Sequence, residues 1–255
     1  YHDFDIFGTQ ECFIHQLKDM KEALPGYDYI GVGRDDGREK GEHSAIFYRT
    51  DKFDVIEKGD FWLSETPDVP SKGWDAVLPR ICSWGHFKCK DTGFEFLFFN
   101  LHMDHIGKKA RVESAFLVQD KMKELGKGKE LPAILTGDFN VDQTHQSYDA
   151  FVSKGVLCDS YEKAGFRYAI NGTFNDFDPN SFTESRIDHI FVSPSFQVKR
   201  YGVLTDTYRS IVGKGEKKQA NDCPEEIDIK TYQARTPSDH FPVKVELEFD
   251  QRQQK

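Results

Sequence analysis

Short apolar runs of about the length of a β-strand recur along the whole of this 255-residue chain. The run from Phe94 to His102 is aromatic and almost uninterrupted, which is typical of a strand covered on both faces. The run from Phe241 to Phe249 instead alternates apolar and charged residues, which indicates one solvent-facing side. No repeat and no long Pro- or Ser-rich linker divides the chain, so we expect a single domain over residues 1–255.

Only a few stretches have the apolar spacing of a helix. These are residues 13–24, residues 108–125 with Gly126 at their end, and residues 146–154. Strands are expected at residues 4–8, 27–33, 44–48, 53–61, 81–88, 94–102, 132–136, 186–192, 198–206 and 241–249, with Asp91-Thr92-Gly93 as a hairpin turn. Residues 207–235 are polar and irregular, and we expect an exposed loop there. Many strands and few helices indicate two packed sheets with helices outside them.

The composition excludes several classes of protein. The 22 Phe and 10 Tyr exclude wholesale disorder, and no apolar run reaches the roughly 18–20 residues that span a bilayer. Acidic residues outnumber basic ones by 43 to 34, which argues against a protein that grips long nucleic acid through a basic face. A local cationic site, such as a bound metal, remains compatible with that charge. The five scattered cysteines include no C-x-x-C pair, so we expect mostly buried, reduced thiols, with a disulfide still open.

Polar side chains follow or interrupt the apolar strands at five places. The residues are Gln10 and Glu11; His102, Asp104 and His105; Asp138 and Asn140; Asp188 and His189; and Ser238, Asp239 and His240. Strand ends and the loops after them are where enzymes hold reactive groups on a rigid scaffold. Each place alone has an ordinary structural explanation, such as a turn former or a hydrogen-bonded histidine. Five in one chain favour a functional site.

The residue types at these places indicate a chemistry. Four side chains carry the hard oxygen ligands that Mg²⁺ or Mn²⁺ prefers: Glu11, Asp138, Asn140 and Asp239. The imidazoles of His102 and His240 can transfer protons near neutral pH. The chain has no Gly-x-Ser-x-Gly motif for a nucleophilic serine. The remaining chemistry is hydrolysis by a water that a metal or a histidine activates.

Taken in order, these motifs resemble the endonuclease/exonuclease/phosphatase (DNase I-like) superfamily. The motifs are Gln10-Glu11, Asn100-Leu101-His102, Gly137-Asp138-Phe139-Asn140, Arg186-Ile187-Asp188-His189 and Ser238-Asp239-His240. The resemblance covers nearly the whole chain, and the loops around Arg34 and Trp74 are most similar to the CCR4/nocturnin-like branch. It implies an α/β (α+β) fold, a four-layer αββα sandwich of two mainly antiparallel sheets with the site at one end. It also implies Mg²⁺-dependent cleavage of a phosphodiester or phosphomonoester.

The resemblance also assigns roles. Glu11 would bind the metal, with Asp239 as a further ligand, and Asp138 would orient or deprotonate the attacking water. Asn140 would hold the scissile phosphate, and His102 would be a second imidazole on the phosphate side. His240 would contact the phosphate or act as acid/base, with Asp188 hydrogen-bonded behind it.

The sequence departs from the family at its beginning. The family starts with a strand that ends in a metal-binding Asn, whereas here only three residues precede the first readable strand. We therefore expect the family's first strand to be missing from this chain. The chain opens at Tyr1-His2-Asp3 without a Met or a targeting segment, so we expect that processing removed something or that the chain is a fragment, and its compartment is not indicated. Because no apolar run spans a bilayer, we expect a soluble protein, and we expect it to be a monomer.

Three further residues are candidates for contact with the substrate. Arg34 stands in a loop that could equally be solvated, Arg80 could reach a phosphate or form a salt bridge, and Trp74 could stack on a ring or pack in a loop. The substrate is expected to be a phosphate ester, and the resemblance favours a nucleotide or single-stranded nucleic acid.

Two alternatives stay open. Asn100-x-His102-x-Asp104-His105 is close to the signature of metallo-β-lactamase-type zinc hydrolases, with Asn in place of the first His. The second alternative is a catalytically impaired binding module of the same fold, which the missing first strand would support.

Overall fold

The computed structural model describes residues 2–126, 131–212 and 232–249 of the chain. Its helices are α1 (Ile14–Ala23), α2 (Lys108–Leu125), α3 (Gln146–Val152) and α4 (Ser160–Lys163). Its strands are β1 (Ile6–Gly8), β2 (Tyr27–Ile30), β3 (Ile46–Arg49), β4 (Phe53–Trp62), β5 (Ile81–Cys89), β6 (Glu95–His102), β7 (Ala133–Asp138), β8 (Cys158–Asp159), β9 (Phe166–Tyr168), β10 (Asp188–Val192), β11 (Phe196–Val203), β12 (Tyr208–Ile211), β13 (Tyr232–Arg235) and β14 (Val243–Phe249).

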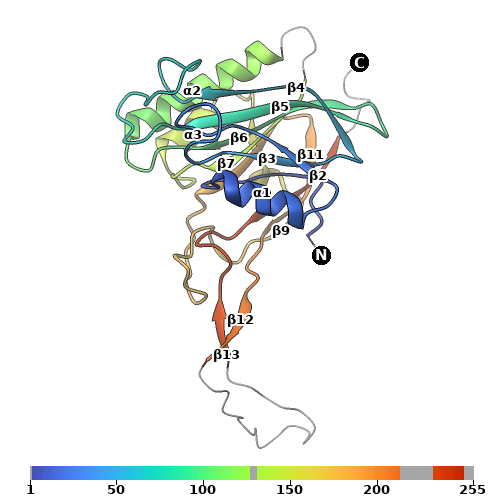
Figure 1. Ribbon diagram of the computed structural model, residues 1–255, viewed down its shortest axis with the longest axis vertical. Helices are drawn as coiled ribbons and strands as arrows, with labels where there is room; N and C mark the ends of the chain where they lie inside the picture. Colours follow the sequence, from blue (N-terminus) through green and yellow to red (C-terminus); the bar gives the residue numbers. More distant parts are fainter. Residues whose placement is uncertain (1, 127–130, 213–231, 250–255) are drawn as a thin grey trace, which may run out of the picture.

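Two layers of sheet face each other, with helices outside (Figure 1). One layer is a six-stranded sheet in the order β4-β5-β6-β7-β10-β8. The other consists of two three-stranded sheets, β1-β3-β2 and β14-β11-β9. Helices α2 and α3 pack on the outer face of the six-stranded sheet, α1 packs on β3, and α4 packs beside β10 and β11. The predicted four-layer sandwich is confirmed, with its second layer divided.

The aromatic strand β6 is buried on both faces, as its sequence predicts. Phe96 and Phe98 belong to the apolar cluster between the two sheet layers. Leu97, Phe99 and Leu101 belong to the cluster beneath α2 and α3. Because successive side chains of a strand point to opposite faces, an uninterrupted apolar run fills both cores at once. β5 and β6 form the predicted hairpin, with Gly93 in the left-handed conformation at its turn.

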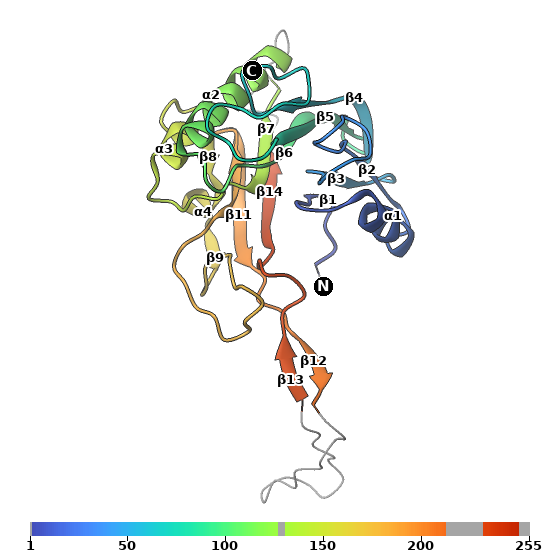
Figure 2. The ribbon, with the colours of Figure 1, turned by 60° about the vertical axis from the view of Figure 1, so that its left-hand side comes forward.

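The second layer is divided into two sheets, one ending in β1 and the other in β14. In the described part of the chain, β1 and β14 each stand at the end of their own three-stranded sheet, and both pack against the cluster between the layers. Figure 2 shows β14 and β1 in this layer. The absence of the family's first strand stays a prediction.

The segment predicted as an irregular loop, residues 207–235, is regular at both its ends. β12 and β13 pair there as an antiparallel ribbon that projects from the sandwich (Figure 2), and residues 213–231 lie outside the described residues. Cross-strand neighbours such as Ile211 and Tyr232 stabilise this pairing. The prediction was wrong for these two strands because each has only four residues and a long polar stretch separates them. Cys12, Cys82, Cys89 and Cys158 are free thiols, as expected, but of these four only Cys82 is buried, and Cys223 lies outside the described residues.

Asn100 connects β6 to the segment that carries Glu11. Its side chain is fully buried, and its Nδ2 donates to the carbonyl oxygens of Thr9 at 2.9 Å and Ala45 at 3.0 Å. Its Oδ1 accepts from Gln10 Nε2 at 2.7 Å. A methyl group at Gly8 would lie 2.2 Å from this oxygen, so only glycine fits there. The amide therefore fixes the chain just before Glu11.

Among the helices that the structure describes, none is long and apolar enough to cross a membrane.

Candidate active site

Three of the predicted site residues lie on neighbouring strands in one register. His102 at the end of β6 pairs with Asp138 at the end of β7, and Asp188 at the start of β10 pairs with the same Asp138 from the other side. Residues that pair directly across a sheet stand side by side and point to the same face. The strand ends that the sequence singles out therefore meet because of the pairing of β6, β7 and β10.

Five side chains form a row in which carboxylates and imidazoles alternate. Asp138 Oδ2 lies 3.5 Å from His102 Nε2 and 4.0 Å from His240 Nε2. His240 Nδ1 lies 2.7 Å from Asp188 Oδ2, and at the other end His102 Nε2 lies 4.0 Å from Glu11 Oε1. We call these residues the carboxylate–imidazole row.

The Gly-Asp-Phe-Asn motif fixes the central carboxylate of the row. The backbone N–H of Asn140 donates to Asp138 Oδ1 at 2.8 Å, so Oδ2 remains to face the two imidazoles. Asn140 has a left-handed backbone, with φ of 50°, which asparagine tolerates better than most residues. Its Nδ2 donates to the carbonyl of Met103 at 2.9 Å, and the buried Phe139 ring anchors the turn in the core.

The three inner groups of the row have displaced pKa values. Burial alone would lower the pKa of His240, but its hydrogen bond to Asp188 and the nearby carboxylates raise that pKa to about 9. Burial, followed by the charge of Asp188, raises the pKa of Asp138. Burial and the guanidinium of Arg80 hold the pKa of His102 well below its usual range. At neutral pH, His240 is therefore a cation and His102 is neutral.

The oxygen ligands of the site suit a divalent metal ion. The Glu11 side chain is 63% exposed, and its Oε1 lies 4.0 Å from Nε2 of the neutral His102. Asp138, Asp188 and His240 place one ligand atom each within 4.8 Å of one another. However, Asp188 and His240 bond to each other, which leaves Glu11 better placed than that pair to receive a metal. Asp239 lies beside His240, and its Oδ1 accepts from the hydroxyl of Ser238 at 3.4 Å.

The predicted substrate-contact residues divide into two kinds. Arg34 and Arg80 are buried and line a narrow recess together with Glu11 and His102. Arg34 forms a bidentate pair with Glu42, at 2.6 and 2.8 Å. Arg80 lies 3.5 Å from Asp104 and bonds to His105 Nδ1 at 3.0 Å. Trp74 does not line this recess, and its backbone N–H bonds to Glu65 in a neighbouring loop.

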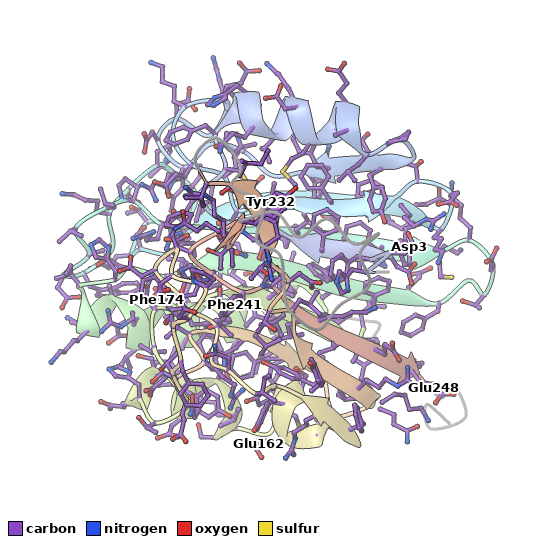
Figure 3. The ribbon with its side chains drawn as sticks, turned by 90° about the horizontal axis from the view of Figure 1, so that it is seen from below. Asp3, Glu162, Phe174, Tyr232, Phe241 and Glu248 are labelled. Carbon is purple, nitrogen blue, oxygen red and sulfur yellow. The ribbon has the colours of Figure 1, made fainter. Side chains whose placement is uncertain are left out.

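Sequence reasoning missed Phe174. Its ring centroid lies 5.2 Å from that of His240, its backbone bridges to the same residue, and 41% of the residue is exposed. Phe174 stands in an irregular loop, where neither strand nor helix periodicity marks it. Figure 3, which views the protein from below, shows Phe174, which bridges to His240, and Phe241, which follows His240 in the sequence.

Other polar residues of the motifs have structural roles. Arg186 pairs with Asp159 at 3.0 Å, and the buried His189 lies 3.0 Å from the carbonyl of Val141. The carboxylate of Asp104 accepts backbone N–H bonds at 2.8–3.3 Å from Val77, Leu78, Ile106 and Gly107. Asp104 is thus occupied in holding its loop.

Comparisons with known proteins agree with this geometry. The model described as "Endonuclease/Exonuclease/phosphatase family" matches residues 1–240. The uncharacterized protein L388 of Acanthamoeba polyphaga mimivirus is 31% identical over 259 residues, covering 96% of this chain and 86% of that protein. The CCR4-Not complex 3'-5'-exoribonuclease subunit Ccr4 of Debaryomyces hansenii is 24% identical over 262 residues. That match covers 87% of this chain and only 30% of the yeast protein.

Solved structures show the same fold. An endonuclease/exonuclease/phosphatase family protein from Bacteroides thetaiotaomicron is 86% identical with a TM-score of 0.90, covering 98% of this chain and 86% of that one. A structure from the same species described as a mannosyl-6-phosphatase is 85% identical with a TM-score of 0.90, covering 98% and 87%. The human nocturnin catalytic domain, 18% identical with a TM-score of 0.58, covers 76% and 72% and shares the fold.

The raised pKa of His240 predicts the alkaline limit of activity. If catalysis uses protonated His240, activity is present below pH 9 and falls as the pH rises through about 9. Asp188→Asn removes the carboxylate that raises this pKa, so the fall moves to lower pH. The measurement is kcat/KM against pH on a phosphate ester.

Asp149→Asn, on the exposed side of α3, is the control and should leave the alkaline limit of activity in place. An unmoved limit in Asp188→Asn would contradict this role of the pair.

Proposed function

Because the chain belongs to the endonuclease/exonuclease/phosphatase family, and is therefore a phosphoester hydrolase, we propose that it is a divalent-metal-dependent phosphatase acting on a hexose phosphomonoester. The observation that carries the proposal is the carboxylate–imidazole row, with a half-exposed aromatic ring beside it. The 85% identity to a protein named a mannosyl-6-phosphatase supports the class of substrate.

Family membership removes the zinc-hydrolase alternative. That prediction from Asn100-x-His102-x-Asp104-His105 was wrong, because the chain matches a different family over residues 1–240. The Asp104 carboxylate is also engaged by backbone N–H groups and Arg80. A catalytically impaired binding module of the same fold would match the same family, so what argues against it is the row, which is complete in the structure.

Asp138 is the group that we assign to the attacking water. Its Oδ1 is fixed by the Asn140 N–H, and its Oδ2 faces the two imidazoles. Because its pKa is raised, the carboxylate is a stronger base than an exposed aspartate once it is ionised. It would orient the water and accept its proton as the oxygen attacks phosphorus.

His240 and Asn140 would act on the phosphate. Protonated His240 can place its Nε2–H on a phosphate oxygen or pass that proton to the leaving alkoxide, while Asp188 holds Nδ1. One amide N–H of the Asn140 side chain donates to the Met103 carbonyl, so the other can donate to a non-bridging oxygen of the phosphate. Neutral His102 would donate a second hydrogen bond without adding charge.

A divalent ion would be held by Glu11, with Asp239 as a further ligand. When bound, it supplies positive charge that neutralises the phosphate oxygens and polarises phosphorus. Mg²⁺ suits these oxygen ligands, and Mn²⁺ can replace it.

The leaving group would lie against Phe174. Aromatic rings pack well on apolar surface, and a hexose presents a face of C–H groups that the exposed ring beside His240 could cover. Arg34 is already paired with Glu42, and Arg80 with Asp104, so neither is a free cation for a second phosphate. The net charge of −9 also disfavours an extended polyanion.

An exonuclease acting on a short single strand is the second candidate. It is favoured by the 24% identity to the yeast Ccr4 subunit and by the sequence-based expectation of a nucleotide substrate. Both candidates cleave a P–O ester bond, of a phosphomonoester in the first and of a phosphodiester in the second, so the assay must compare the two kinds of substrate.

A substrate panel tests the proposal. Metal-stripped protein is given mannose 6-phosphate, mannose 1-phosphate, AMP and a short oligoribonucleotide, with and without Mg²⁺. We expect phosphate release only with Mg²⁺, and the highest kcat/KM on mannose 6-phosphate. Asp138→Asn should reduce kcat at least about 100-fold, because it removes the base. Preferred cleavage of the oligoribonucleotide would replace this proposal with the second candidate, and activity without any metal would contradict the cofactor.

The aromatic contact has its own test. Phe174→Ala should raise KM for mannose 6-phosphate several-fold and change kcat less, because it removes binding surface rather than a reacting group. Phe177→Ala is the matched control, since Phe177 is a 62% exposed phenylalanine in the same loop. Equal KM values in the two variants would exclude Phe174 as a substrate contact.

A further inference from the structure

Thr173 lies between the two segments that carry Asp188 and His240, and it is bonded to both. It is fully buried, and its Oγ1 accepts from the backbone N–H of Ile187 at 2.9 Å and of Asp188 at 3.1 Å. Its carbonyl oxygen accepts from the backbone N–H of Phe241 at 2.6 Å. One residue therefore fixes the chain directly beside each member of the Asp188–His240 pair.

The segment that carries Asp138 is bonded to Ile187, the residue that Thr173 Oγ1 contacts. The carbonyl of Ile187 accepts from the N–H of Phe139 at 2.9 Å, and Phe139 stands between Asp138 and Asn140. Since the N–H of Ile187 donates to Thr173 Oγ1, both backbone polar groups of Ile187 are bonded within the site. Three segments far apart in the sequence are thus connected through Thr173 and Ile187.

The residues after Thr173 strengthen its link to the His240 loop. Phe174 forms a β-bridge with His240, and the N–H of Asn175 donates to the carbonyl of Asp239 at 2.7 Å. The side chain of Thr173 supplies the corresponding link to β10. Without its hydroxyl, the loop would stay attached to His240 and would lose its two bonds to Ile187 and Asp188.

We propose that Thr173 is a positioning residue of the hydrolytic site, whose hydroxyl sets the Asp188–His240 contact and thereby aims the imidazole at Asp138 and the phosphate. Two part-buried backbone N–H groups, those of Ile187 and Asp188, need an acceptor at this point, and a threonine hydroxyl can accept both. Valine has nearly the same shape but no acceptor, so it leaves both N–H groups unsatisfied. The proposal rests on the proposed function only for the substrate of its assay.

The test compares Thr173→Val with Thr173→Ser and with a matched control. Thr183→Val removes another hydroxyl of the same region, which accepts from the N–H of Ser185 at 3.1 Å and holds no residue of the row. On mannose 6-phosphate with Mg²⁺, Thr173→Val should lower kcat about 10- to 100-fold, with KM within about twofold. Thr173→Ser should stay within about threefold of the wild type, because the acceptor is kept, and Thr183→Val should match the wild type.

A spectroscopic signature separates positioning from a general loss of structure. We expect the proton in the 2.7 Å contact between His240 Nδ1 and Asp188 to give a strongly deshielded resonance in the substrate-free protein. This resonance should shift or broaden in Thr173→Val and persist in Thr173→Ser and Thr183→Val. The signal needs no turnover, so it decides the role of Thr173 even if hexose phosphates are not the substrate.

The outcomes are distinct. An unchanged resonance with kcat within about threefold of the wild type in Thr173→Val would overturn the proposal, as would an equal loss in Thr173→Ser. If Thr173→Val does not fold, Thr173→Ala replaces it at a temperature where its circular dichroism is native, and the same comparison with Thr173→Ser holds. Wild-type protein that leaves every hexose phosphate intact would contradict the proposed function alone.

Discussion

The lateral pairing of β6, β7 and β10 is the constraint on which the candidate site depends. Asp138 stands between His102 and Asp188 because these residues occupy matching positions on three neighbouring strands. A shift of one residue would turn these side chains to the other face of the sheet. The register is protected by the core on both faces, where the apolar residues of β6 and β7 fill two separate clusters. The burial that stabilises the sandwich therefore also maintains the geometry of the row.

The charges in the row follow from this arrangement. Asp138 is buried close to two imidazoles, and only one of them, His240, has its own carboxylate in hydrogen-bonding contact. Against the effect of burial, the hydrogen bond to Asp188 raises the pKa of His240 and makes it a cation, whereas burial and the guanidinium of Arg80 lower the pKa of His102 and leave it neutral. Two histidines of one site can thus differ in protonation at one pH, so that one supplies charge and the other supplies a neutral hydrogen bond.

Much of the fold and the centre of the site could be predicted from the sequence. The strand periodicity, the doubly buried β6 and the polar strand ends each have a local signature, and Asp138, Asp188 and His240 come together as expected. Sequence alone could not separate Asp188 from its motif neighbours Arg186 and His189, because only tertiary contacts show that these two are structural. Thr173 and Phe174 lie in an irregular loop, and their roles come from bonds to residues 14 and more than 60 positions away. The ribbon of β12 and β13 was missed because each strand has only four residues and a long polar stretch separates them.

The central claim is that the row directs a water molecule, activated by Asp138, onto the phosphorus of the substrate. Hydrolysis of mannose 6-phosphate in H₂¹⁸O tests this directly, with ³¹P NMR to read the label in the released phosphate. The account predicts one ¹⁸O atom in every phosphate formed and none in the sugar. Label in the sugar hydroxyl would mean that water attacks carbon and the C–O bond breaks, which would contradict the account.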